Sequence, residues 1–323
     1  MEIFKKGNIY NFMGKRLPFL GLSLFLVLSS IGIILTKGLN LGIDFSGGTI
    51  VQVQYEGKAP ISNIRSELSK TKKYSKVNVT KFGSEHEVIL KIPTSTGNIS
   101  VDIGDEIRNI LKPTGTFEIR RVDMVGPKVG GELKEKGLMA LSLALLVILV
   151  YVSFRFEWRF AVASIFALVH DITIALGAIA LFQVDANLDI LAAILTILGY
   201  SLNDTIIVFD RIREGVQTSK SNDLDSVVNE SVSKTLSRTT LTSLTTFFVV
   251  FTLFMFGGEI INGFSFTLLI GVIVGTYSSI FVAATILVQL KFSISNYRQN
   301  EAEKLKRQQE KDRMRAMYEQ GTV

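Results

Sequence analysis

The chain has 323 residues, of which 47% are hydrophobic and 20% are charged, with a formal net charge of +6 and no cysteine. Four long stretches contain no charged residue: 17–36, 137–154, 239–258 and 260–290. A membrane-spanning helix needs roughly 20 mostly apolar residues. The composition therefore excludes a soluble globular enzyme, a disordered chain and a disulfide-stapled secreted domain, and it predicts a polytopic α-helical membrane protein.

Six transmembrane helices are expected. Four are the uncharged stretches, and two more are apolar segments that ionisable residues interrupt. The third helix contains His170 and Asp171, and the fourth contains Asp204. The predicted helices cover residues 17–36, 137–154, 160–182, 188–209, 236–256 and 264–290. They divide the chain into an N-terminal tail (1–16), the first helix (17–36), an outer domain (37–136), helices two to six (137–290) and a charged C-terminal tail (291–323).

The distribution of lysine and arginine predicts which side of the membrane each segment faces, because these residues are enriched in cytoplasmic loops. Loops 183–187 and 257–263 contain no lysine or arginine and carry Asp185 and Glu259 instead. The positive residues of the other segments include Lys5, Lys6, Lys15, Arg16, Arg155, Arg159, Arg211, Arg213, Lys220, Lys234 and Lys291. We therefore expect both termini in the cytoplasm and residues 37–136 on the extracytoplasmic side.

The outer segment has the periodicities of a small α+β domain. The expected elements, in chain order, are strand Thr49–Tyr55, helix Ile61–Ser69, strands Lys76–Phe82 and Glu87–Ile92, helix Asp102–Leu111 and strand Thr116–Met124. This βαββαβ order predicts a ferredoxin-like fold with a four-stranded antiparallel sheet. It contains no metal, nucleotide or catalytic-triad motif, so a binding or mechanical role suits it better than catalysis.

Asp204 and Arg238 are the sharpest candidates for a functional site, since ionisable side chains within a bilayer are costly and usually functional. Asp204 lies about 9 Å from the expected cytoplasmic edge at Asp210, at 1.5 Å per residue, and Arg238 lies about 6 Å deep by the same rise. The two side chains could therefore pair, and protonation of the carboxylate would open the pair. The alternative is a structural ion pair that only fixes helix register.

Other polar residues of the helices are candidates for a proton path or for helix packing. Ser201 and Asn203 come shortly before Asp204, and Thr242 belongs to a hydroxyl-rich half of the fifth helix. Hydroxyls can line a file of water, but they also pack helices tightly. His170 and Asp171 point about 100° apart on a helix, so they are not expected to form one site by themselves. Proton handling and interhelical hydrogen bonding remain open for both, and no metal or other cofactor is expected.

Glycine-rich sequences mark the entry into the outer domain and the exit from it. The segment 42–48 reads GIDFSGG and contributes Gly42, Asp44, Phe45, Gly47 and Gly48. It suits a tight entry from the first helix into the first strand, and it is not a phosphate loop because no helix or lysine follows. The pair Gly126-Pro127 precedes the second helix in the same way.

Together these motifs resemble the SecF members of the bacterial SecD/SecF protein-export family. The resemblance rests on GIDFSGG, Val125-Gly126-Pro127, His170-Asp171, residues 199–214 (GYSLNDTIIVFDRIRE) and Ser237-Arg238-Thr239, in this order along six helices. It covers about residues 10–295. It implies an RND-type transporter subunit rather than an enzyme, with Asp204 as the proton-coupling aspartate and Arg238 as its partner arginine.

The resemblance also implies partners and a location. A SecD subunit would supply the other six-helix half, and the pair would associate with the SecYEG channel, commonly with YajC, in the bacterial inner membrane. Driven by the proton-motive force, it would help draw an unfolded preprotein out on the far side. Apart from these proteins, membrane lipid is expected as a contact and nucleic acid is not. Two alternatives remain: half of a proton-driven small-molecule exporter, and a scaffold whose charges only hold helices in place.

Overall fold

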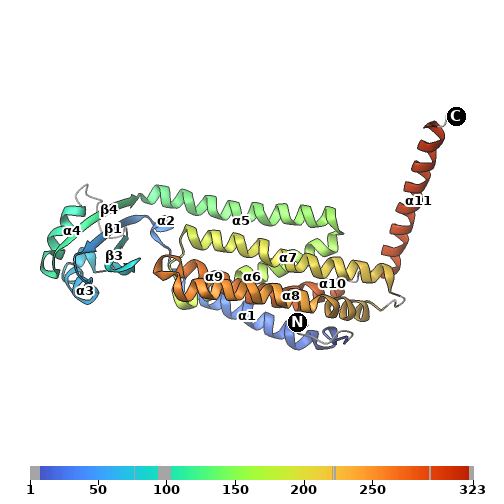
Figure 1. The fold of residues 1–323 in the computed structure, drawn as a ribbon, viewed down its shortest axis with the longest axis horizontal. Coiled ribbons are helices and arrows are strands. Elements are labelled where there is room, and N and C mark those ends of the chain that lie inside the picture. Colours follow the sequence, from blue (N-terminus) through green and yellow to red (C-terminus); the bar gives the residue numbers. More distant parts are fainter. Residues whose placement is uncertain are drawn as a thin grey trace.

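The structure is a computed structural model, and it describes residues 8–75, 77–93, 103–219, 221, 223–290 and 292–319. The predicted orientation uses Lys5, Lys6, Lys220 and Lys291, which lie outside these residues, as do parts of both predicted tails. A bundle of long helices occupies one end of the molecule and a small sheet domain the other (Figure 1). Both ends of the described chain lie at the end of the bundle far from the sheet.

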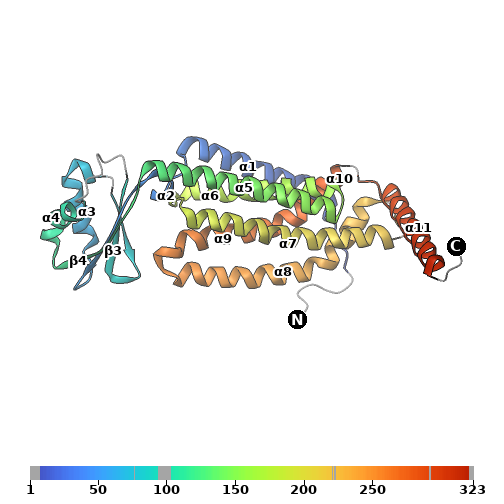
Figure 2. The ribbon, with the colours of Figure 1, turned by 90° about the horizontal axis from the view of Figure 1, so that it is seen from above.

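Six helices are long and apolar enough to cross a membrane, which confirms the predicted number of spans. They are α1 (Arg16–Lys37, after a short 3-10 turn at Met13–Lys15), α5 (Pro127–Arg155), α6 (Trp158–Phe182), α7 (Leu188–Thr218), α8 (Leu224–Phe256) and α9 (Gly258–Ser278). The last continues through a π-helical stretch (Ser279–Ala283) into α10 (Ala284–Gln289). The helices run side by side along the bundle in both views (Figures 1 and 2).

Three helices extend well beyond the predicted spans. Helix α5 begins at Pro127 rather than near 137, α7 continues to Thr218 rather than ending near 209, and α8 begins at Leu224 rather than near 236. The prediction stopped at charged residues because it looked for a membrane core. Lysine, arginine and glutamate are good helix formers, so a helix can continue into water after it leaves the apolar layer.

The outer domain has the element order predicted for it. Its elements are β1 (Gly48–Tyr55), α3 (Ile61–Lys70), β2 (Asn78–Phe82), β3 (Ser84–Pro93), α4 (Ile103–Leu111) and β4 (Phe117–Val125). The strands lie in the order β2-β3-β1-β4, and all three neighbouring pairs are antiparallel. Alternate residues such as Val51 and Leu90 are fully buried against Ile64 of α3 and Ile107 of α4. This arrangement confirms the ferredoxin-like fold class.

Burial separates the helices of the bundle into central and peripheral ones. In their most apolar windows, 56% of the residues of α6 and α9 are buried, against 11% in α1 and α5 and 17% in α8. Large apolar side chains such as Leu24, Leu143 and Phe248 are therefore exposed on the peripheral helices. Continuous apolar surfaces of this kind are covered in the cell by lipid or by another membrane subunit.

The GIDFSGG segment joins the outer domain to the bundle. It forms a short helix, α2 (Ile43–Ser46), whose Asp44 carboxylate accepts a hydrogen bond from the backbone N–H of Leu188, the first residue of α7, at 3.0 Å. The Gly42 N–H donates to the carbonyl of Ala186 at 2.7 Å. On the other side, Gly130 of α5 lies so close to the backbone of α2 that a Cβ there would be 2.9 Å from the Gly47 nitrogen and 3.1 Å from the Phe45 carbonyl oxygen. The predicted tight entry is thus also a contact with the starts of α5 and α7.

The far end of α7 is held in a different way. Helix α11 (Ile294–Glu319) follows the bundle and runs across the direction of the membrane helices (Figures 1 and 2). Its Arg298 guanidinium donates to the backbone carbonyls of Val216 and Ser219 at 2.7 and 2.6 Å, where α7 ends. Terminal carbonyls of a helix lack partners within it, and an arginine satisfies them well. Arg16, at the start of α1, pairs with Asp225 of α8 at 2.9 Å at this same end.

Candidate proton-coupling site within the membrane helices

Asp204 is enclosed in the bundle. Its side chain is 1% exposed and lies on the face of α7 that also presents Ser201, Thr205 and Val208. Ser243 of α8 donates its hydroxyl to Asp204 Oδ2 at 3.0 Å. Asp204 Oδ1 is buried and has no hydrogen-bond partner among the described residues. The surroundings are rich in hydroxyls, and Thr276 of α9 also lies beside the carboxyl. An unpartnered buried oxygen is nevertheless costly, so Asp204 is a candidate for a group that changes its protonation state or its partner.

The expected ion pair between Asp204 and Arg238 is not formed in this structure. The Arg238 side chain is exposed, and it makes no ion pair or hydrogen bond within the part of the chain that the structure describes. Asp204 instead meets Ser243, five residues further along α8. Five residues turn a helix by about 140°, so the two side chains leave α8 on different faces. The depth estimate placed them at similar levels, but it carried no information on which face of α8 turns toward α7.

Two of the candidate proton-path residues point away from Asp204. Asn203 is exposed on α7, and Thr242 is exposed on α8 with its hydroxyl donating to the carbonyls of Arg238 and Thr239 in its own helix. Thr245 and Thr246 bond in the same way to the carbonyl of Thr242. Most of these hydroxyls therefore satisfy themselves locally, as serine and threonine commonly do in helices. Ser243 reaches the carboxylate instead.

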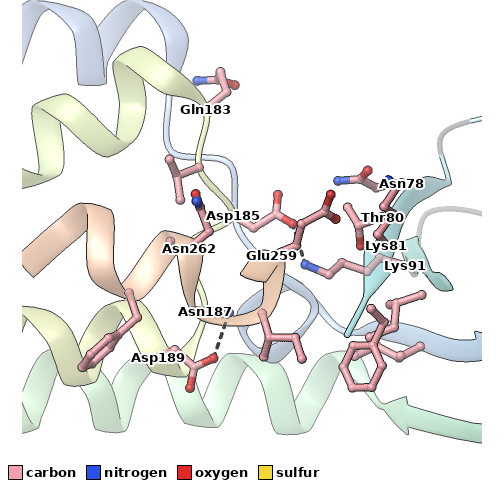
Figure 3. Close-up of a pocket in the computed structure, with 17 residues that line it drawn as sticks. Asn78, Thr80, Lys81, Lys91, Gln183, Asp185, Asn187, Asp189, Glu259 and Asn262 are labelled. Atoms are coloured by element: carbon pink, nitrogen blue, oxygen red, sulfur yellow. Dashed lines mark hydrogen bonds and ion pairs between the residues drawn. The ribbon is translucent and has the colours of Figure 1, made fainter. Parts of the chain in front are cut away.

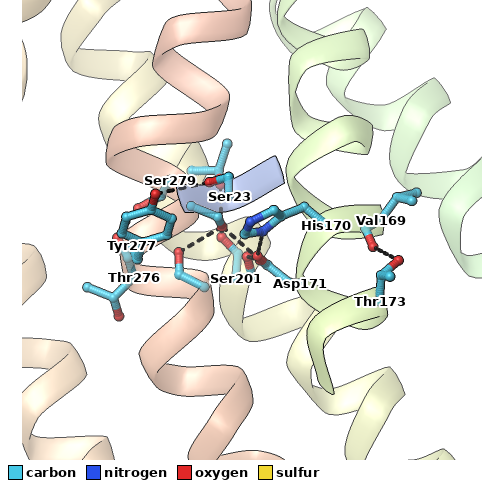
Figure 4. Close-up of polar contacts among 12 residues, drawn as sticks. Ser23, Val169, His170, Asp171, Thr173, Ser201, Thr276, Tyr277 and Ser279 are labelled. Atoms are coloured by element: carbon cyan, nitrogen blue, oxygen red, sulfur yellow. Dashed lines mark hydrogen bonds and ion pairs between the residues drawn. The ribbon is translucent and has the colours of Figure 1, made fainter. Parts of the chain in front are cut away.

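The other three candidates, His170, Asp171 and Ser201, meet at one carboxylate, although His170 and Asp171 were not expected to form one site by themselves. His170 Nδ1 lies 2.9 Å from Asp171 Oδ1, although the two residues are adjacent on α6. Asp171 Oδ2 accepts hydrogen bonds from Ser201 of α7 at 2.5 Å and from Ser278 of α9 at 2.8 Å (Figure 4). The 100° argument failed because side-chain torsions let an imidazole turn back to a neighbouring carboxylate. Interhelical hydrogen bonding had been left open for Asp171, but its donors, Ser201 of α7 and Ser278 of α9, could not be assigned from the sequence.

Close helix packing brings these hydroxyls to Asp171. A Cβ on Gly275 of α9 would lie 3.0 Å from the Cβ of Ser201, so glycine lets α9 approach α7 a few tenths of an ångström closer than a larger residue would at this level. Ser278 follows one turn later and reaches the same carboxylate oxygen. Small residues in the middle of the bundle therefore position the polar contacts. Gly275 and Ser278 were not among the candidate residues, and their only signal was their small size at a spacing of three.

A cleft separates the sheet from the outer ends of the bundle. Its volume is about 410 Å³, and it lies between β2 and β3 on one side and the loop after α6 with the first turns of α7 and α9 on the other (Figure 3). Lys81 and Lys91 line it from the sheet. Asp185 of the loop, Asp189 of α7 and Glu259 of α9 line it from the bundle. Lys91 pairs with Asp185 at 2.8 Å, and Asn40 donates to the same aspartate at 2.6 Å. Opposite charges thus hold the outer domain against the bundle on one side of the cleft.

The remaining motif residues lie where the outer domain connects to the helix bundle. Gly47 ends α2, and Gly48 begins β1, where it pairs with Pro93 and Val125. Gly126 and Pro127 begin α5, with proline at the first helical position, which it favours. Within the described residues, no group of three or more histidine, cysteine, aspartate or glutamate side chains could hold a metal ion.

Comparison with known proteins places this arrangement in a family. The model described as protein export membrane protein SecD/SecF, C-terminal, matches residues 106–293, and the model of the SecD/SecF GG motif matches residues 32–59. The fold and the buried site define the class as a six-helix membrane protein with one small outer domain and carboxylates enclosed between its helices. Within this class, the chain belongs to the SecD/SecF family of protein export membrane proteins.

Individual relatives and solved structures agree with this assignment. The chain is 50% identical over 323 residues to protein translocase subunit SecF of Helicobacter pylori strain J99, which covers 100% of both chains. It is 38% identical over 300 residues to SecF of Escherichia coli O157:H7, covering 92% of this chain and 93% of that one. SecDF from Thermus thermophilus, a translocon-associated membrane protein, superposes with a TM-score of 0.79 at 34% identity. That match covers 90% of this chain but only 40% of the SecDF chain.

Proposed function

We propose that the chain is an auxiliary subunit of the Sec protein-export machinery, which works with a SecD partner and uses the proton-motive force to promote preprotein translocation. Two findings support the subunit role: the full-length similarity to translocase subunits named SecF, and the match to part of a longer SecDF chain. Since the chain spans about 40% of that SecDF chain, a separate SecD subunit would supply the remainder. SecYEG and YajC are the further partners we propose.

The proposal of proton coupling rests on the buried Asp204 carboxyl, of which only one oxygen accepts a hydrogen bond from the described residues. When Asp204 is protonated, it can remain beside Ser243 as a neutral group. When it is charged, it needs a cation, and Arg238 is the nearest candidate along α8. Helix α8 is peripheral, so it can turn or shift at a smaller packing cost than α6 or α9. Proton binding and helix movement would then be linked, because each protonation state favours a different neighbour.

Arg238 also points to where the partner subunit binds. Its guanidinium is exposed in the hydroxyl-rich half of α8, where Leu241 and Leu244 are exposed too. A charge at this depth requires a polar or acidic neighbour. We propose that the SecD half covers this face of α8. The protein would lie in the bacterial inner membrane with both termini in the cytoplasm, and the sheet domain would meet the emerging preprotein on the outer side.

The test is export of a reporter preprotein into membrane vesicles that contain the complete machinery, with and without an imposed proton gradient. Asp204→Asn keeps the size of the side chain and a hydrogen-bond acceptor for Ser243, but it cannot change charge. We expect it to insert normally, to assemble with its partner and to abolish the gain in export that the gradient provides. Arg238→Met should do much the same, whereas Arg238→Lys should retain part of the gain because a positive charge remains.

Asp189→Asn is the matched control, since it makes the same chemical change on the same helix at an exposed position. It should respond to the gradient as the wild-type protein does. If Asp204→Asn vesicles also respond fully at matched subunit levels, the proton-coupling role is wrong and the scaffold alternative should be preferred.

A further inference from the structure

The polar cluster around Asp171 is more deeply enclosed than Asp204. Asp171 is 0% exposed, His170 is 7% exposed, and both lie in α6, one of the two most buried membrane helices. The Tyr277 ring of α9 stacks on the imidazole, with 6.2 Å between ring centres. The Tyr277 hydroxyl donates to the carbonyl of Phe19 and lies 3.0 Å from the Ser23 hydroxyl, both in α1. Four helices therefore meet around one histidine–aspartate pair (Figure 4).

The pair has room for one more proton. Both oxygens of Asp171 have hydrogen-bond partners, but His170 Nε2 is buried and has none among the described residues. With a charged carboxylate and a neutral imidazole, the pair has a net charge of −1 in an apolar surrounding. A proton taken up at Nε2 allows the Nδ1 proton to pass to Asp171 Oδ1, which leaves a neutral acid and a neutral imidazole. Burial favours this uncharged form over the ion pair.

Proton uptake would change how strongly three helices are held together. Hydrogen bonds to a carboxylate are about twice as strong as those between neutral groups. The hydroxyls of Ser201 and Ser278 bind Asp171 Oδ2 from α7 and α9, so neutralising the carboxyl weakens both contacts at once. The π-helical stretch Ser279–Ala283 begins directly after Ser278. Such stretches are often found at functional sites, where a helix departs from regular geometry.

The cluster is also connected to Asp204. Ser201 precedes Asp204 by three residues on the same buried face of α7, a separation of about 4.5 Å along the helix axis. Few other titratable side chains lie in the apolar middle of the helices packed against α6. They are Asp204 and Tyr200 of α7, Tyr277 of α9 and Tyr151 of α5. Towards the ends, α1 carries Arg16 and Lys37, α5 carries residues such as Lys134, Glu135 and Arg155, and α7 carries Asp189, Asp210, Arg211, Arg213 and Glu214. No lysine or arginine of the described residues forms an ion pair with His170 or Asp171. The charge of the pair is therefore set mainly by its own protonation and by Asp204.

We propose that His170 and Asp171 form a second proton-binding site, which takes up one proton and thereby loosens the hydroxyl contacts that hold α6 to α7 and α9. Its use in export rests on the proton-driven function proposed above, but its chemistry does not. The site adds a second buried carboxyl, on α6, whose donor Ser201 lies within one helical turn of Asp204 on α7, so that a change at one carboxyl can reach the other through α7.

Infrared spectroscopy of the full chain in lipid nanodiscs tests this proposal, because a protonated carboxyl has a carbonyl stretch that a carboxylate lacks. The spectrum is followed from acid to alkaline pH. We expect Asp171→Asn to remove one titrating component and Asp204→Asn to remove another. Ser201→Ala combined with Ser278→Ala should make the Asp171 component persist to higher pH, because the charged form loses two donors.

Asp189→Asn is again the matched control and should leave both buried components in place. The proposal is wrong if Asp171→Asn, shown to be monodisperse, has the same titrating spectrum as the wild-type protein. Should Asp171→Asn fail to fold, the double serine variant decides, since an unmoved component would contradict a titrating Asp171. Loss of gradient response in Asp204→Asn vesicles is a separate result, so either proposal can fail without the other.

Discussion

Two aspartates are buried on neighbouring helices of this bundle, Asp171 on α6 and Asp204 on α7, and their surroundings differ. Asp171 has both oxygens bonded, by an imidazole of its own helix and by hydroxyls of α7 and α9. Asp204 has one oxygen bonded by α8 and the other without a partner among the described residues. The first lies between central helices and the second beside a peripheral one. The difference indicates that the Asp171 contacts hold helices together, whereas Asp204 is free to exchange partners.

The largest expected effect is on the free energy of unfolding, which should fall much more when the Asp171 carboxyl is removed than when the Asp204 carboxyl is. Asp171→Leu removes the acceptor of three buried donors, and we expect a loss of about 3 kcal/mol or more. Asp204→Leu removes a half-satisfied charge, so it should cost about 1 kcal/mol or less, or even stabilise the protein. Thermal unfolding of the purified variants in detergent measures both. Equal destabilisation by the two changes would remove the distinction between them.

An intermediate effect is expected from the hydroxyls. Ser243→Ala removes the bond to Asp204 Oδ2, and a hydrogen bond to a charged group contributes about 1.5–3 kcal/mol. Ser201→Ala should cost about 1 kcal/mol, because Ser278 still donates to the same oxygen of Asp171. The same unfolding measurement, with Ser142→Ala on the exposed face of α5 as a control, ranks them. A larger loss for Ser201→Ala would indicate that Ser278 does not compensate.

The smallest effect concerns a third carboxylate, Asp44, which differs from both because it is partly exposed and bonds a backbone N–H. Asn187 is the N-cap of α7 and accepts from the N–H of Ile190, so Asp44 adds one further acceptor at Leu188. Asp44→Ala should cost about 1 kcal/mol, the usual value for a lost hydrogen bond, and Asp44→Asn should cost less because an acceptor remains. Hydrogen exchange at the first turn of α7 provides the measurement, and unchanged protection in Asp44→Ala would show that Asn187 holds this turn without Asp44.

The membrane architecture could be predicted from the sequence because it depends on composition and period alone. Four uncharged runs and two apolar runs interrupted by ionisable residues located the six helices, and alternation located the strands of the outer domain. Helix ends were missed, since residues such as Lys134 and Glu135 in α5 continue a helix outside the apolar layer. Composition locates the apolar layer, whereas the length of a helix depends on what packs against it in water.

The candidate site was predictable only in part. Asp204 was found because a carboxylate within an apolar run is costly wherever it points. Its neighbour was not found, because the face of α8 turned toward α7 depends on packing between the two helices. The contact between His170 and Asp171 was missed for a related reason. It depends on side-chain torsions and on hydroxyls from α7 and α9, which are far apart in the sequence.

The hydrogen bonds that hold both ends of α7 have a mechanical consequence. The outer domain holds its first residue through Asp44, and Arg298 of α11 holds its last carbonyls. Its 31 residues span about 46 Å at 1.5 Å per residue. Helix α7 therefore connects the outer domain rigidly to α11, because both of its ends are bonded to other elements. A displacement of less than an ångström at its middle, where Asp204 lies, would reach the outer domain and α11 together rather than being absorbed by a flexible loop.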